Sequence, residues 1–142
     1  GRHGYGAKLT NIFSAAFTVE TGDRERGLVY RQTWRDNMAV CERPVITNVG
    51  SRARDYTLIT FQVDFKRFGI KSLDQDAVSL FGRRVLDVAG CLPALRCSLN
   101  GKHIQVASVQ ALANKFLSGA FGDRAGPSIW NSAPRWEVVA AR

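Results

Sequence analysis

The chain has 142 residues, of which 45% are hydrophobic and 23% charged, and its formal net charge at pH 7 is +8. This length fits one domain with a buried core, and no apolar run reaches membrane-spanning length, so we expect no membrane partner. Residues 1–64 carry nine Lys or Arg against seven Asp or Glu, a balance of +2, whereas residues 65–142 carry eleven against five, a balance of +6. The basic second half suits a partner with a phosphate backbone, and a solvated basic surface is the alternative.

The three cysteines, Cys41, Cys91 and Cys97, are far apart and form no Cys-x-x-Cys pair. This spacing argues against a disulfide framework and against a zinc site. Cys41 and Cys97 lie in apolar runs, so we expect both to be small core residues. His3 and His103 are too isolated to form a metal site, and we assign no metal ligand.

The chain begins with a glycine-rich segment that leads into a helical pattern. Gly1, Gly4 and Gly6 permit positive φ and a close approach of the backbone to a ligand. A helix N-terminus after such a loop offers unpaired N–H groups and the positive end of a dipole to a phosphate. Arg2 and Lys8 add positive charge on either side. These features are compatible with a phosphate-binding loop.

Two common phosphate-binding motifs do not match this segment. A P-loop has Gly directly before Lys and then Ser or Thr, but here Ala7 precedes Lys8 and Leu9 follows it. The dinucleotide fingerprint has the order G-x-G-x-x-G, whereas the order here is G-x-x-G-x-G. On composition alone, an ordinary glycine-rich turn is therefore an equal alternative.

The rest of the first half predicts one helix followed by strands. Leu9, Ile12, Phe13 and Ala16 have the spacing of one buried helix face. Alternating residues and turn signals then predict antiparallel strands joined by short turns, with Trp34 and the phenylalanines in the core. The expected strands are 16–21, 28–34 and 56–65, with a turn at 22–23 and a polar loop over 50–55. Residues 38–41 and 45–49 are expected to form either one further strand with a kink at Pro44 or a pair of strands.

The second half predicts a long helix, a hairpin and a further helical segment. We expect Ser72 as the N-cap of the long helix, Gln75 as its capping-box partner and Gly90 as the C′ residue. The expected buried stripe of this helix is Val78, Phe81, Val85, Val88 and Leu92. The other expected segments are hairpin strands over 95–99 and 102–106 about Asn100-Gly101, helical spacing over 109–117, a glycine-rich connector over 119–127 and a strand over 136–140.

Nine stretches, in this order, resemble one family. The first is Gly1-Arg2-His3-Gly4-Tyr5-Gly6-Ala7-Lys8, followed by Leu9-Thr10-Asn11-Ile12-Phe13-Ser14. The others are 17–21, Gln32-Thr33-Trp34 with Asn37-Met38, 55–62, 72–74, Arg83-Arg84, 87–90, 99–102 and 135–138. Together they resemble the ATP-lid motif and following segments of eukaryotic-type type II DNA topoisomerases, members of the GHKL ATPase superfamily that also contains gyrase, Hsp90, histidine kinases and MutL. The resemblance is close over residues 1–106, thin over 107–134, and returns at the end.

The resemblance implies a fold class and a division into domains. The expected fold is α/β, an α+β sandwich that forms the C-terminal half of a GHKL (Bergerat) ATPase fold. Its sheet would be mixed and mostly antiparallel, with helices on one face. Residues 1–113 would be the later half of the ATPase domain, and residues 114–142 a connector and the first part of a transducer domain. Since other parts of that fold would lie outside this chain, we expect an exposed apolar sheet edge or face.

The resemblance also implies ATP and Mg²⁺ as cofactors. The implied ATP-binding residues are Gly1, Arg2, His3, Gly4, Tyr5, Gly6, Ala7 and Lys8, which would wrap the triphosphate. His3 stands where eukaryotic members usually have Asn and gyrase-type relatives have His, which leaves open a changed nucleotide contact. The family's general-base Glu, its Mg²⁺-binding Asn and its adenine-reading Asp lie upstream of this loop. We therefore name no catalytic residue and expect the Mg²⁺ ligands outside this chain.

The implied function is part of an ATP-dependent type II DNA topoisomerase. In this family, ATP binding dimerises two ATPase domains around one DNA duplex, which then passes through a double-strand break in another. We expect a homodimeric enzyme in the nucleus, with a mitochondrial or viral enzyme as alternatives, and we expect this chain alone to be inactive. Another GHKL-superfamily ATPase, a non-catalytic basic DNA-binding fragment and an inactive version from a degenerate gene copy are the competing interpretations.

Overall fold

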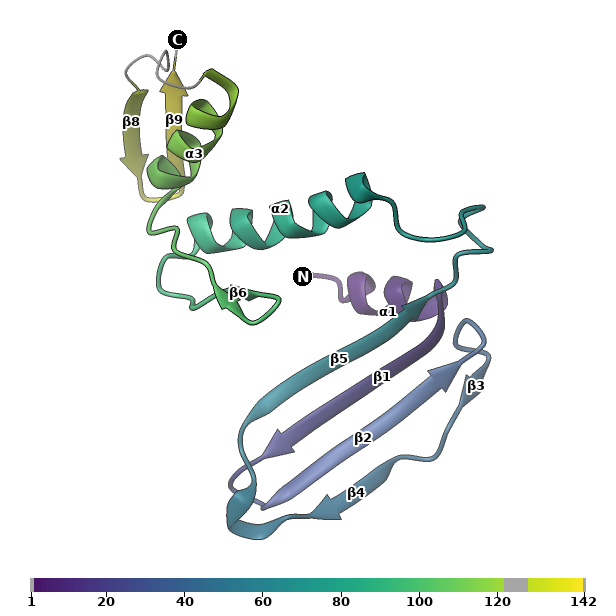
Figure 1. Ribbon diagram of the computed structural model, residues 1–142. Coiled ribbons are helices and arrows are strands. Elements are labelled where there is room, and N and C mark those ends of the chain that lie inside the picture. Colours follow the sequence, from purple (N-terminus) through teal and green to yellow (C-terminus); the bar gives the residue numbers. More distant parts are fainter. Residues whose placement is uncertain (1, 122–127, 142) are drawn as a thin grey trace. The chain divides into compact units, whose positions relative to one another are not determined.

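The computed structural model describes residues 2–121 and 128–141 and divides into two compact units, Gly1–Ser72 and Leu73–Arg142 (Figure 1). We describe each unit by itself. The first unit contains α1 (Tyr5–Ile12), β1 (Ser14–Asp23), β2 (Leu28–Arg35), β3 (Val40–Cys41), β4 (Val45–Asn48), the 3₁₀ helix η1 (Gly50–Arg52) and β5 (Tyr56–Val63). The second contains α2 (Gln75–Cys91), β6 (Ser98–Leu99), β7 (Lys102–His103), α3 (Val109–Phe121), β8 (Ser128–Ala133) and β9 (Trp136–Ala141).

The first unit is built on an antiparallel sheet of order β3-β2-β1-β5, with β4 also paired to β2 (Figure 1). The strand β1 is central because it pairs on one side with β2 and on the other with β5. Phe17 of β1 lies opposite Trp34 in β2 and Phe61 in β5, and its side chain is only 3% exposed. The Phe17 and Trp34 rings are 6.2 Å apart, so this cross-strand aromatic pair stabilises the middle of the sheet.

The structure confirms the expected strands of the first unit with small shifts at their ends. Gly22 and Asp23 are the exception, because both belong to β1 and the turn follows them. The predicted helix ends earlier than its apolar spacing suggested, since α1 stops at Ile12 and Ala16 already lies in β1. The expected buried face of this helix is wrong, because the side chains of Leu9, Ile12 and Phe13 are exposed.

Several expected core residues of the sheet are exposed. Phe61 is 48% exposed, and Phe13 and Phe68 are exposed as well, whereas Phe17 is buried and Trp34 half-buried. Cys41 is also exposed, because it belongs to the two-residue strand β3, which pairs only with β2. The exposed apolar sheet surface that we expected is present. It includes Val45, Ile46, Leu58, Ile59 and Phe61.

The N-cap of the long helix α2 in the second unit lies two residues later than expected. Asp74, and not Ser72, is the N-cap, and its carboxylate accepts a hydrogen bond of 2.8 Å from the N–H of Ala77. A carboxylate is favoured there because it also meets the positive end of the helix dipole. At the other end Gly90 lies within the helix, which continues to Cys91 with Leu92 as the C-cap, so the expected C′ position was wrong.

The core of the second unit lies around the end of α2 and the start of α3. Its buried residues are Ala89, Cys97, Val106 and Leu112, so the expectation of a buried Cys97 is confirmed. Most of the expected stripe on α2 is exposed instead; these residues are Val78, Phe81, Val88 and Leu92.

The expected hairpin about Asn100-Gly101 is present, with strands β6 and β7 of two residues each. The helical spacing over 109–117 corresponds to α3, and the strand expected over 136–140 corresponds to β9. The strand β8, which pairs with β9, was not expected. Residues 122–127 of the expected connector lie outside the described residues. Within the part of the chain that the structure describes, no helix has both the length and the apolar character needed to cross a membrane.

Candidate functional site

The glycine-rich segment forms a turn that opens directly into α1. Gly4 is the N-cap residue and has φ 67° and ψ 9°, a left-handed conformation that glycine adopts without a steric penalty. As a glycine, Gly4 has no side chain that could cap this helix end, and the N–H groups in the first turn of a helix have no intrahelical acceptor. A Cβ added at Gly4 or Gly6 would meet no atom within 4 Å, so the backbone is open on both sides of the turn.

The charged and aromatic side chains of the segment are exposed around this turn. Arg2, His3, Tyr5 and Lys8 all belong to the exposed class, and the His3 and Tyr5 rings lie 6.0 Å apart with an angle of 26° between their planes. Gly1 lies outside the described residues. Residues 2–8 thus occupy one turn and the first turn of α1, where the cationic side chains of Arg2 and Lys8 are exposed.

The C-terminal half of α1 is held by side chains that point back along the helix. Thr10 Oγ donates to the Gly6 carbonyl at 2.9 Å, and the buried Ser14 Oγ donates to the Thr10 carbonyl at 2.5 Å. Asn11 is only 6% exposed, and its Oδ1 has no hydrogen-bond partner among the described residues.

The end of α1 is also contacted by residues that sequence reasoning did not single out as functional. The turn after β2 contains Asn37, whose side-chain amide donates to Asp64 Oδ2 at 3.1 Å, beside the junction of α1 and β1. The Asn37 hydrogen bond is the main cause that lowers the pKa of Asp64 below its ordinary value, against the opposing effect of desolvation. The only sequence signal was the resemblance at Asn37-Met38, which carried no role.

These features are compatible with a phosphate ligand. The N–H groups of the first helical turn and the exposed Arg2 and Lys8 are donors of the kind that bind phosphate oxygens. Within the described residues we find no group of three or more His, Cys, Asp or Glu side chains that could hold a metal ion.

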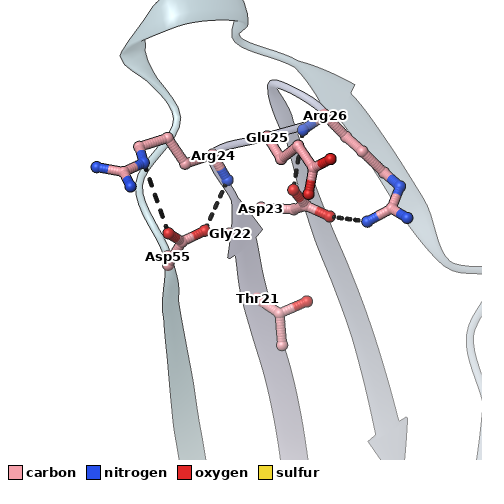
Figure 2. A pocket seen from close by; sticks show the side chains of 7 residues that line it. All are labelled: Thr21, Gly22, Asp23, Arg24, Glu25, Arg26 and Asp55. Carbon is pink, nitrogen blue, oxygen red and sulfur yellow. Dashed lines mark hydrogen bonds and ion pairs between the residues drawn. The ribbon is translucent and has the colours of Figure 1, made fainter.

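An open hollow of about 780 Å³ lies at the far tip of the β1–β2 hairpin (Figure 2). The main-chain N–H of Arg24 donates to Asp55 Oδ1 at 2.8 Å, and Nε of the Arg24 guanidinium lies 3.6 Å from Asp55 Oδ2. Arg26 forms an ion pair of 2.5 Å with Asp23. The main-chain N–H of Arg26 and then its guanidinium, which both bond to Asp23, lower the pKa of this carboxyl below its ordinary value, against the opposing effect of desolvation. Because both arginines face carboxylates and Glu25 adds a further negative charge, the hollow has no surplus positive charge to attract a phosphate.

No protein-family model matches the chain, but individual proteins do. It is 41% identical to DNA topoisomerase 2 of Arabidopsis thaliana over 99% of this chain and 10% of that protein. It is 50% identical to the mitochondrial DNA topoisomerase 2 of Dictyostelium discoideum over 73% of this chain and 8% of that protein. The chain thus spans about a tenth of the length of these curated relatives.

A comparison of structures gives the same result. The crystal structure of the ATPase region of Saccharomyces cerevisiae topoisomerase II matches 98% of this chain and 36% of its own chain, with a TM-score of 0.87 and 38% identity. This match confirms the expected α/β fold class. The expected boundary between residues 113 and 114 and the ATP-binding role of residues 1–8 stay predictions.

Proposed function

Because this chain belongs to the family of type II DNA topoisomerases, we propose that it forms part of the ATPase region of an ATP-dependent enzyme of that family. The observation that carries the proposal is the uncapped N-terminus of α1 opened by Gly4 at φ 67°. This geometry occurs in a segment for which the sequence independently resembles the ATP lid. The competing assignments, another GHKL ATPase or a basic DNA-binding fragment, are not favoured by the similarity to topoisomerases.

In this proposal the glycine loop binds and orients the triphosphate of ATP. The backbone N–H groups at Tyr5, Gly6 and Ala7 donate to phosphate oxygens, as helix N-termini do in other phosphate sites. Arg2 and Lys8 neutralise phosphate charge through charge-assisted hydrogen bonds. The binding and hydrolysis of ATP would supply energy to the enzyme. Mg²⁺, held by ligands outside this chain, would neutralise further charge on the phosphates.

The wider parts of the proposal concern the whole enzyme. We assign residues 1–113 to the ATPase domain and 114–142 to a connector and the first part of a transducer domain. The enzyme would act on DNA as a homodimer, and the net charge of +8 is favourable for contact with phosphate. We propose a nuclear location; the mitochondrial relative of Dictyostelium supports an organellar location as the alternative.

The test is a titration of the chain with the non-hydrolysable ATP analogue AMPPNP in the presence of Mg²⁺, followed by amide NMR shifts. We expect the shifts to centre on residues 2–8, and Lys8→Ala to weaken binding about tenfold or more, since hydrogen bonds to charged groups contribute about 1.5–3 kcal/mol. Lys71→Ala, which removes an exposed lysine outside the loop, is the matched control. Equal weakening by both variants, or no binding at all, would contradict the proposed site.

Two further experiments separate the competing functions. Replacement of the aligned segment of yeast topoisomerase II by this chain should preserve ATP hydrolysis and DNA strand passage if the chain is a functional ATPase segment. Binding of duplex DNA that falls steeply with salt and ignores nucleotide would instead favour the DNA-binding fragment.

A further inference from the structure

The turn that follows β2 has an unusual backbone. Three successive residues other than glycine, Asp36, Asn37 and Met38, have positive φ values of 53°, 57° and 72°. This left-handed conformation is unfavourable for L-residues because Cβ crowds the neighbouring carbonyl oxygen. Such strain persists only where surrounding contacts impose it, and it is common at functional sites. The contacts of this turn therefore indicate which part of the molecule it serves.

The turn is bonded to the junction between α1 and β1. The N–H of Asp36 donates to the Ala15 carbonyl at 3.0 Å, and the N–H of Asn37 donates to the Ser14 carbonyl at 3.1 Å. The side-chain amide of Asn37 lies 3.4 Å from the same Ser14 carbonyl. The left-handed backbone thus turns both the main chain and the side chain of Asn37 towards the first residues of β1.

A second segment, which follows β5, donates hydrogen bonds to the same junction, at the carbonyls of residues 12 and 13. The N–H of Asp64 donates to the Phe13 carbonyl at 3.0 Å, and Arg67 Nη1 donates to the Ile12 carbonyl at 3.2 Å. The two segments are joined to each other, because Asn37 Nδ2 donates to Asp64 Oδ2 at 3.1 Å. Four successive carbonyls, those of residues 12–15, therefore accept hydrogen bonds from two segments that meet at one side-chain pair.

This junction joins α1 to the sheet. Leu9 and Ile12 are exposed, and Asn11 is the buried residue of this helix. An eight-residue helix is about 12 Å long at about 1.5 Å per residue. A tilt of about 10° at its base would therefore move its N-terminus by about 2 Å, and displacements of about 1 Å suffice to impair a site that depends on orientation.

We infer that Asn37 is a positioning residue for the glycine loop: with Asp64 it clamps residues 12–15 and fixes the direction of the N-terminus of α1. The inference rests on the proposed ATP-binding role of that loop and deepens it. Asparagine suits the position because it tolerates the left-handed conformation and its short amide can donate to a neighbouring carboxylate. Glycine would tolerate the backbone but supplies no donor.

Three variants separate the side-chain clamp from the backbone turn. Asn37→Gly keeps the left-handed backbone and removes the amide. Asn37→Asp places a carboxylate opposite that of Asp64, whereas the double variant Asn37→Asp/Asp64→Asn restores one donor and one acceptor with unchanged net charge. Asn48→Gly is the matched control, since Asn48 forms a local turn with the Gly50 N–H at the end of β4.

Two readouts on the 142-residue chain are needed, both well below the melting temperature of every variant. One is the affinity for AMPPNP, and the other is the orientation of α1 relative to β1 from residual dipolar couplings. We expect Asn37→Gly and Asn37→Asp to weaken AMPPNP binding about tenfold and to reorient α1. The double variant should return both readouts to near the wild-type values, and Asn48→Gly should change neither.

Each adverse result has a distinct meaning. If Asn37→Gly and Asn37→Asp lower the melting temperature but leave affinity and α1 orientation unchanged, the turn only stabilises the fold and the inference is wrong. If the wild-type chain binds no AMPPNP, the proposed function fails. The clamp is then judged by α1 orientation alone, and an unchanged orientation in Asn37→Gly overturns it.

Discussion

The same substitution, Gly to Ala, should have opposite effects at Gly22 and at Gly82. Gly22 lies in the central strand β1, opposite Tyr56 of β5. A Cβ at this position would be 2.1 Å from the Arg54 carbonyl oxygen and 2.5 Å from Cε1 of Tyr56. At Gly82, within α2, the nearest atom is Leu99 Cδ2 at 3.6 Å, which is an ordinary contact.

The two magnitudes follow from these distances. Overpacking of a fixed site costs about 1–3 kcal/mol, and we expect the upper part of this range at Gly22 because a main-chain carbonyl must move. The lower unfolded-state entropy of alanine offsets about 0.4–1 kcal/mol, so Gly22→Ala should destabilise the first unit by about 2 kcal/mol. Gly82→Ala should instead stabilise α2 by up to about 1 kcal/mol, the difference in helix propensity.

Amide hydrogen exchange measured by NMR reports the two units separately. In Gly22→Ala the protection of the β1 and β5 amides should fall about thirtyfold, since 1.4 kcal/mol corresponds to a factor of ten. In Gly82→Ala the protection of the α2 amides should rise by up to about fivefold. Unchanged or increased protection of the β1 amides in Gly22→Ala would show that the Arg54 carbonyl and the Tyr56 ring move aside at little energetic cost. The steric reasoning would then be wrong.

Three further predictions concern a cap, a carboxylate and the glycine loop. Asp74→Ala should destabilise α2 by about 1 kcal/mol in thermal unfolding, while Ser72→Ala should have little effect, because the cap bond belongs to Asp74. The hydrogen bond from Arg83 lowers the pKa of Asp87 below its ordinary value of 3.8. The stabilising contribution of the Asp87 carboxylate should therefore be complete above about pH 3.8 and lost as the pH falls through the folded-state pKa. Asp87→Asn should abolish this part of the acid unfolding curve. Gly4→Ala should weaken AMPPNP binding about five- to thirtyfold in titration, since the left-handed conformation costs a non-glycine residue about 1–2 kcal/mol, whereas Gly4→Asn should weaken it less.

Local chemistry in the sequence was sufficient to predict most of the elements. Alternation predicted β1 and β2, and Asn100-Gly101 predicted the β6–β7 hairpin. The glycines predicted a loop that leads into a helix, but the helix begins at Tyr5, within the glycine segment and before the apolar spacing that starts at Leu9. Each of these depends on residues that are neighbours in the chain. The N-cap of α2 shows the limit of such reasoning, because Ser72 and Asp74 both fit a cap and only the structure distinguishes them.

The tertiary structure alone decided which residues are buried and what holds α1. Phe17 and Phe61 have similar sequence surroundings, but Phe17 lies on a strand with neighbours on both sides, whereas Phe61 lies on β5, which pairs only with β1. The contact between Asn37 and Asp64 joins residues 27 positions apart. It requires β1 between β2 and β5 in one register and a turn of three left-handed residues. No local pattern specifies that combination, because the energy that imposes it comes from hydrogen bonds between segments that are distant in the chain.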